Sequence, residues 1–280
     1  MKIKEIQTVF GTKRINMVPW ESKLIPEKLF KYRDWKKDYH RNILLHQEIF
    51  IPSPRTFNDP FDCQISIAFH LLKYDENLVL DYFNKVVRRH FPNYSTEQHN
   101  QEVIKLLKEG RYKNDAFIFS QNKQALKKIH DTLGVFSVTA VNDNVLMWAH
   151  YSNNHSGFCV GFDSVQLFSY LGGGGEIFYE KDYPTILPTE DFINQMLRQT
   201  NTKASYWNYE IEYRLTKMNG ADSIIIIPKE IITDVILGYK ISKSDERDII
   251  KIISLELPHV KVYKTKPKDL SFEFDLIELF

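Results

Sequence analysis

Short segments of alternating or continuously apolar residues are spread along most of the chain, and many of them are rich in β-branched and aromatic side chains. Such segments predict strands. From about Glu76 to His130 the apolar residues instead recur at helical spacing, which predicts a helical segment. Residues 232–280 predict a strand, a helix and a further strand. The other predicted strands are 28–33, 46–51, 134–140, 157–162, 177–180, 207–215 and 223–227.

A short helix is predicted from Val145 to Tyr151, with a cap supplied by one of the three residues before it, Asn142, Asp143 or Asn144. The glycine run at 172–175 lacks the Lys-Ser/Thr of a phosphate-binding loop and predicts a flexible linker. Together the elements predict one α+β domain over residues 1–280. Its sheet is expected to be mixed and mostly antiparallel, with a helical insertion at 76–130.

Composition and charge narrow the class of protein only a little. The chain has 280 residues, 43% hydrophobic and 26% charged, as in an ordinary globular protein. Its 37 Lys and Arg balance 36 Asp and Glu, so charge gives no reason to expect constitutive nucleic-acid binding. The two cysteines and the absence of zinc spacing argue against a disulfide framework or a structural zinc. No apolar run predicts a signal peptide or a membrane span, and we expect a cytoplasmic protein that does not bind membranes.

Charged and aromatic residues alternate in the segment 209–215. In a strand, Glu210, Glu212 and Arg214 would share one face, and the apolar residues between them would share the other. One interpretation is a solvated strand face with a Glu-Arg pair. The other is that the two carboxylates border a pocket and divide the labour of catalysis between them.

Two further segments carry candidate chemistry. In the helix predicted at 145–151, Trp148 and Tyr151 form an aromatic stripe that either packs in the core or stacks on a planar ligand. His150 is either a hydrogen-bonded partner or a general base. The segment 57–62 contains turn-forming residues that either stabilise a loop or serve a site. The fork of donors on Arg33 could hold a phosphate or a carboxylate.

Taken in order, the motifs resemble the bacterial domain-of-unknown-function 2971 family, over most of residues 29–260. That resemblance supplies no activity. The motifs that carry it are Leu29 to Arg33, Phe57 to Asp62, Met147 to Tyr151, Gly157 to Phe162 and Trp207 to Arg214.

A second resemblance is to the ADP-ribosyltransferase superfamily, which uses an early Arg, a middle Ser or Tyr, and a late Glu within Glu-x-Glu. The matching positions are Arg33, then Ser137 or Tyr151, then Glu212 preceded by Glu210. This resemblance implies a split β-sheet with NAD as the substrate. Nicotinamide would leave, and ADP-ribose would pass to an unknown acceptor or to water.

The same resemblance implies roles for individual residues. Glu212 would hold the ribose 2′-hydroxyl and oppose the developing positive charge, and Glu210 would position the acceptor. Tyr151 or Trp148 would stack nicotinamide, and Arg33 would hold the pyrophosphate or ribose. A toxin or anti-phage defence effector, with an inhibitory partner protein, is the biological role it suggests. The other residues expected to bind NAD are Tyr32, Asn58, Asp59, Ser137, His150 and Arg214.

Two other functions fit the same residues. Asp59, Asp62, Glu210 and Glu212 could be oxygen ligands of Mg²⁺ in a nuclease or phosphotransferase. Alternatively, the pocket could bind a nucleotide without turning it over, as in a sensor or an interaction domain.

Overall fold

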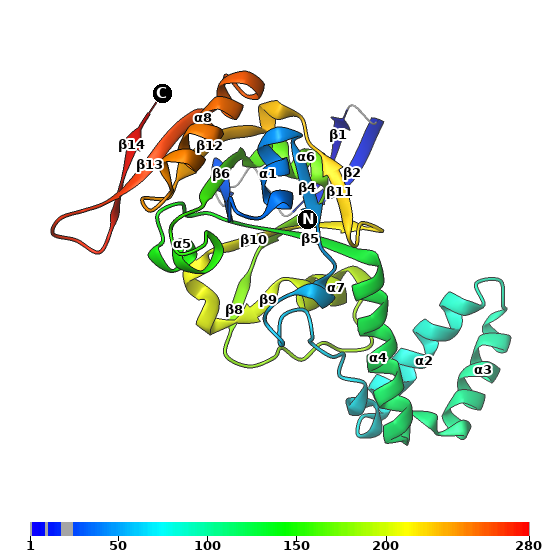
Figure 1. Ribbon diagram of the computed structural model, residues 1–280. Coiled ribbons are helices and arrows are strands. Elements are labelled where there is room, and N and C mark those ends of the chain that lie inside the picture. Colours follow the sequence, from blue (N-terminus) through cyan, green and yellow to red (C-terminus); the bar gives the residue numbers. More distant parts are fainter. Residues whose placement is uncertain (1, 9–10, 18–24, 280) are drawn as a thin grey trace. The chain divides into compact units, whose positions relative to one another are not determined.

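A computed structural model describes residues 2–8, 11–17 and 25–279 of the protein (Figure 1). The chain divides into two compact units. Unit 1 contains Met1–Pro52, Gly134–Ile177 and Tyr206–Phe280, and unit 2 contains Ser53–Leu133 and Phe178–Ser205. The segment predicted as a helical insertion is grouped with a second, distant segment in unit 2, and the single domain over residues 1–280 stays a prediction.

Unit 1 is built on an eight-stranded sheet. Its strands are β3 (Lys28–Arg33), β5 (Leu133–Thr139), β6 (Phe158–Asp163), β7 (Gly174–Glu176), β10 (Glu212–Met218), β12 (Ile232–Leu237), β13 (Lys261–Pro267) and β14 (Phe274–Glu278). Their order is β14-β13-β12-β6-β3-β5-β10-β7. β12 and β13 are parallel, whereas β3, β6, β12, β7 and β10 pair with neighbours in the antiparallel sense. The predicted α+β class with a mostly antiparallel sheet is confirmed.

The glycine run predicted as a linker ends in the edge strand β7, where Gly174 pairs with Leu215 of β10. Gly174 has a φ of 156°, and a Cβ at this position would lie 1.9 Å from the carbonyl oxygen of Arg214. Only glycine allows the edge strand to approach so closely. The sequence pattern predicted a flexible linker here. In the structure, Gly174 instead lies in a strand, at a position where a side chain would not fit.

Helices cover both faces of this sheet. They are α1 (Asp38–Leu45), α5 (Val145–Tyr151), α6 (Ser164–Leu171) and α8 (Lys243–Glu256). The prediction of α5 is confirmed, with Asn144 as its cap, because the Asn144 side chain accepts from the backbone N–H groups of Leu146 and Met147. Two small antiparallel sheets complete the unit: β1 (Lys2–Thr8) with β2 (Gly11–Met17), and β4 (Glu48–Ile51) with β11 (Ser223–Ile226).

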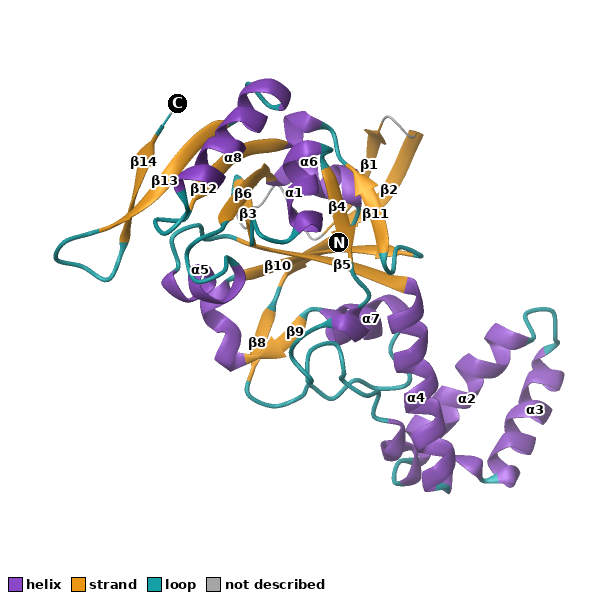
Figure 2. Ribbon diagram, in the orientation of Figure 1, coloured by secondary structure: helices purple, strands orange, loops and turns teal. Residues whose placement is uncertain are grey.

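The two faces of the large sheet can be told apart by the alternation of side chains along β3. Leu29 packs in the main core with residues of α1, α6 and α8, and we call this side the α8 face. Figure 2 draws these helices in purple and the strands in orange. Phe30 and Tyr32 point the other way and pack with Met147 and Trp148 of α5, so we call that side the α5 face. Every candidate residue on these strands can therefore be assigned to one face.

Unit 2 contains the predicted helical segment, which is confirmed as α2 (Glu76–His90), α3 (Thr96–Glu109) and α4 (Asp115–Thr132). In α2, Val79, Phe83 and Val87 recur every four residues and form the buried side of the helix. The unit also contains the parallel strands β8 (Phe178–Glu180) and β9 (Thr202–Ala204), and α7 (Phe192–Thr200).

Candidate functional site

The strand predicted at 207–215 is wrong in its first half. Ser205–Glu210 forms a 3₁₀-helix, and β10 begins only at Glu212. Glu210 therefore ends a helix instead of alternating with Glu212 along one strand. Both glutamates are nevertheless buried, with 3% and 5% of their surface exposed. A segment of irregular backbone thus places two carboxylates inside unit 1.

The irregular backbone is strained at Ile211, which lies between the two glutamates. Its φ is 42°, in a left-handed region that a β-branched residue rarely occupies. The hydroxyl of Thr139 donates to the carbonyl of Glu210, and the N–H of Ala140 donates to the carbonyl of Ile211 at 3.1 Å. These bonds from β5 and the residue after it hold the segment in place. Strain of this kind costs about 1–3 kcal/mol and is typical of functional sites.

Exchanging Ile211 for asparagine should raise the free energy of unfolding of unit 1 by about 1 kcal/mol, because asparagine tolerates the left-handed conformation. The Ile211 side chain is 47% exposed, so little burial is lost. Urea denaturation followed by tryptophan fluorescence measures this change, since Trp35, Trp148 and Trp207 lie in unit 1. A loss of stability would show that Ile211 is not strained.

The two glutamates bind different partners. The hydroxyl of Tyr151 donates to Oε1 of Glu210 at 2.6 Å. The guanidinium of Arg214 forms a two-point contact with Glu212, from Nε to Oε1 at 2.8 Å and from Nη2 to Oε2 at 3.4 Å. Arg214 is fully buried. We call Tyr151, Glu210, Glu212 and Arg214 the carboxylate cluster.

Burial, and then the negative charge of Glu210, raise the pKa of Tyr151 above its usual range. The phenol therefore stays protonated at neutral pH and donates to the carboxylate. This bond fixes Glu210 as a hydrogen-bond acceptor.

His150 and Tyr209 lie next to the cluster. Nδ1 of His150, an exposed residue, is 3.0 Å from the hydroxyl of half-buried Tyr209. The side-chain amide of Asn144 donates to the Tyr209 carbonyl at 3.0 Å, in addition to capping α5. The sequence pattern predicts Asn144 only as a possible cap and predicts no role for Tyr209. The proximity of these two segments depends on the fold, and no local pattern signals it.

Trp148 and Tyr32, two predicted NAD-binding residues, are core residues. Trp148 has no exposed surface, and its ring meets that of Tyr32 edge-on with centroids 5.0 Å apart. The Trp148 indole N–H donates to the carbonyl of Asn142, and the Tyr32 hydroxyl to that of Val141. With both polar groups satisfied, these side chains stabilise the α5 face, and a stacking role for Trp148 does not fit the structure.

Arg33 and Glu212, which the resemblance assigns to the same NAD site, do not lie on the same face of the sheet. On β3, Arg33 alternates with Tyr32 and so lies on the α8 face with Leu29. On β10, Tyr213 and Leu215 belong to the core of the α8 face, which leaves Glu212 and Arg214 on the α5 face. The sheet therefore separates the early arginine from the late glutamate.

Ser137 lies on β5, where alternation with Phe136 and Val138 of the α8-face core places it on the α5 face. It is half-buried, and its carbonyl accepts from the ammonium of Lys31. No contact links Ser137 to the carboxylate cluster in the hydrogen bonds described for unit 1, and its predicted role stays a prediction.

Asn58 and Asp59 belong to unit 2. Asn58 is exposed, whereas Asp59 is 8% exposed and accepts from the backbone N–H of Phe61 at 2.9 Å. This bond stabilises the turn, as expected if the segment 57–62 stabilises a loop and does not serve a site. The residues described in the structure include no group of three or more His, Cys, Asp or Glu side chains that could hold a metal ion. The Mg²⁺ alternative stays a prediction.

The family described as "Protein of unknown function (DUF2971)" matches residues 147–215 of the chain. The matched segment contains His150, Tyr209 and the whole carboxylate cluster, whereas Arg33, Asn58, Asp59 and Ser137 lie outside it. No match to the chain was found among curated proteins or among solved structures. The resemblance to ADP-ribosyltransferases thus stays a prediction. In the described parts of the chain, no helix has the length and apolar character that crossing a membrane requires.

Proposed function

We propose that this protein cleaves the nicotinamide–ribose bond of NAD and transfers ADP-ribose to an acceptor or to water, at the carboxylate cluster on the α5 face. The observation that carries the proposal is the pair of buried glutamates on either side of the strained Ile211, each held by a different partner. A purely structural strand would not need strain at this point. Loss of nicotinamide creates a cation that buried carboxylates can stabilise.

The different partners suggest separate tasks for the two glutamates. Glu212 is held by the two-point contact with Arg214, and we assign this pair the positioning of the cluster. Glu210 is held by the neutral hydroxyl of Tyr151, beside half-buried Tyr209 and exposed His150. We therefore assign the binding of the ribose and the stabilisation of the cation to Glu210. This gives Glu210 the role that the resemblance implied for Glu212.

In the proposed reaction, the bond between C1′ of the ribose and the nicotinamide nitrogen breaks, and its electron pair stays with nicotinamide, which leaves as a neutral molecule. A hydroxyl or amine of the acceptor, or water, then bonds to C1′. The acceptor loses its proton to a base or to solvent. Glu210 remains an anion while the positive charge is greatest.

Purified protein incubated with NAD should release nicotinamide, measured by chromatography. The Glu210→Gln variant should release it at least roughly 100-fold more slowly, because the amide has no charge to oppose the cation. Tyr151→Phe should lower the rate about tenfold by removing the hydrogen bond that orients Glu210.

Tyr206→Phe is the matched control, since Tyr206 lies in the same 3₁₀-helix, 82% exposed, and its loss of a hydroxyl should leave the rate unchanged. Full activity in the Glu210→Gln variant would refute the assignment of Glu210. If the wild-type protein releases no nicotinamide with water, protein or nucleic-acid acceptors, the proposed reaction is wrong, and the nucleotide-sensor alternative gains support.

We extend the proposal to a toxin or defence effector that acts by consuming NAD or modifying an acceptor. Expression of the wild-type chain in bacteria should then lower cellular NAD and slow growth, and expression of Glu210→Gln should not. Equal growth of the two strains, with NAD unchanged, would exclude this role.

A further inference from the structure

A cavity of about 240 Å³ lies on the α8 side of unit 1, where the end of β3 meets α1 and β4. A second cavity of about 390 Å³ shares three lining residues with it, Tyr39, Glu48 and Phe50. The two cavities are neighbours around these shared residues, and we call them together the groove. The larger one by itself reaches the size of sites that bind small molecules, roughly 300–1,000 Å³. All of the lining residues belong to unit 1.

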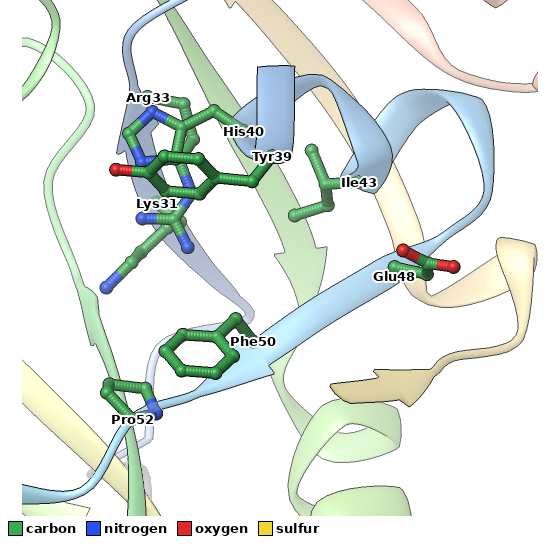
Figure 3. A pocket seen from close by; sticks show the side chains of 8 residues that line it. All are labelled: Lys31, Arg33, Tyr39, His40, Ile43, Glu48, Phe50 and Pro52. Carbon is green, nitrogen blue, oxygen red and sulfur yellow. The ribbon is translucent and has the colours of Figure 1, made fainter. Parts of the chain in front are cut away.

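One end of the groove is basic. Lys31 and Arg33 alternate with Tyr32 on β3 and therefore both line the groove, and Figure 3 shows their side chains extending from the same strand. Lys31 donates to the carbonyl of Ser137. His40 of α1 completes this end (Figure 3).

The charge of Arg33 is not balanced. Among the residues that the structure describes, no carboxylate forms an ion pair with its guanidinium. Burial lowers the pKa of Arg33 to about 10, so the group stays charged at neutral pH. Arg33 is half-buried, and an anionic ligand in the cavity would supply the opposite charge.

His40 contributes a polar ring but no charge. Burial, and then the charge of Arg33, lower the pKa of His40 to about 4. Nδ1 of His40 lies 3.1 Å from the backbone N of Asp34 and 3.2 Å from its carbonyl oxygen, so the backbone of Asp34 holds the ring in place. The basic end therefore presents two cations beside a neutral imidazole.

The rest of the groove is aromatic and ends at a carboxylate. Phe50 of β4 pairs directly with Ile224 of β11, so both side chains lie on the outward face of this small sheet. Phe50 is 43% exposed and Tyr39 is 63% exposed, which leaves both rings open to a ligand. Glu48, two residues before Phe50 on the same face, accepts from the amide of Asn42 at 2.8 Å. Its remaining acceptor sites could bind N–H groups of a ligand.

The geometry points to a second binding site in this groove, for a nucleoside monophosphate: the phosphate at Arg33 and Lys31, the base against Phe50 and Tyr39, and its amino group toward Glu48. Two cations favour a dianionic phosphate over a carboxylate, and exposed rings bind a planar base by stacking. The site lies on the face of the sheet opposite the carboxylate cluster. It does not depend on the proposed reaction.

Isothermal titration calorimetry of the full chain tests the site with adenosine 5′-monophosphate, adenosine and inorganic phosphate as probes. We expect the monophosphate to bind more tightly than either fragment. Arg33→Met should weaken its binding roughly tenfold or more, since a bond to a charged group is lost. Phe50→Ala should weaken the binding of both the monophosphate and adenosine. Arg88→Met, at an exposed arginine in unit 2, is the matched control and should bind normally.

The variant Glu210→Gln separates this site from the carboxylate cluster. It should bind the monophosphate as the wild type does, and Arg33→Met should leave nicotinamide release unchanged. Monophosphate binding that is weakened by Glu210→Gln and not by Arg33→Met would overturn the assignment. Equal affinity for adenosine and its monophosphate, or no heat of binding with any probe at millimolar concentration, would also refute it.

Discussion

Replacing Arg214 with methionine should lower the free energy of unfolding of unit 1 by about 3–5 kcal/mol. Arg214 is fully buried, and its guanidinium holds both carboxylate oxygens of Glu212, which is 5% exposed. Methionine fills much of the volume but leaves the glutamate as a buried charge without this partner. Urea denaturation followed by tryptophan fluorescence measures the loss.

A double-mutant cycle isolates the ion pair from the packing of its side chains. The variant with both Glu212→Met and Arg214→Met removes both charges. Its decrease in the free energy of unfolding should be smaller, by at least about 1 kcal/mol, than the sum of the decreases in the two single variants. Additive losses would mean that the pair has no coupling energy. A loss below about 1 kcal/mol in Arg214→Met would contradict the view that this pair supports the cluster.

Gly157→Ala should destabilise unit 1 by about 2–3 kcal/mol. A Cβ at Gly157 would lie 2.1 Å from the carbonyl oxygen of Arg33 and 2.9 Å from that of Ser152. The N–H of Gly157 also donates to Ser152 at 2.7 Å, and its carbonyl accepts from Gly238. Since the residue is held on several sides, the end of β3 must move. The same urea denaturation measures the effect.

Gly173→Ala is the matched control, because a Cβ at Gly173 would meet no atom within 4 Å. It should change stability by less than about 0.5 kcal/mol. The Gly157→Ala variant should also bind adenosine 5′-monophosphate more weakly, because the movement of β3 displaces Arg33. An unchanged free energy of unfolding in Gly157→Ala would contradict this prediction, because it would show that the end of β3 can move away from the start of β6 without destabilising unit 1.

Local patterns in the sequence predicted the elements whose signal is contained within a few neighbouring residues. Alternation in β3 and β6, the apolar spacing of α2, and the capping asparagine of α5 all have short-range causes, and all are confirmed. The same patterns singled out Glu210, Glu212 and Tyr151 as candidate residues. Their hydrogen bond and their burial follow from the fold that these elements build.

The sequence alone established the α+β class, the helical segment of unit 2 and the charged segment around Glu212. Tertiary structure decided which face of the sheet each charge occupies: Arg33 and Glu212 lie on opposite faces because the registers of β3 and β10 are set by their buried neighbours. It also decided that Ile211 interrupts the predicted strand, because hydrogen bonds from the adjoining strand and the residue after it hold a conformation that the local sequence disfavours. Contacts between distant segments determine such features, and no local pattern contains them.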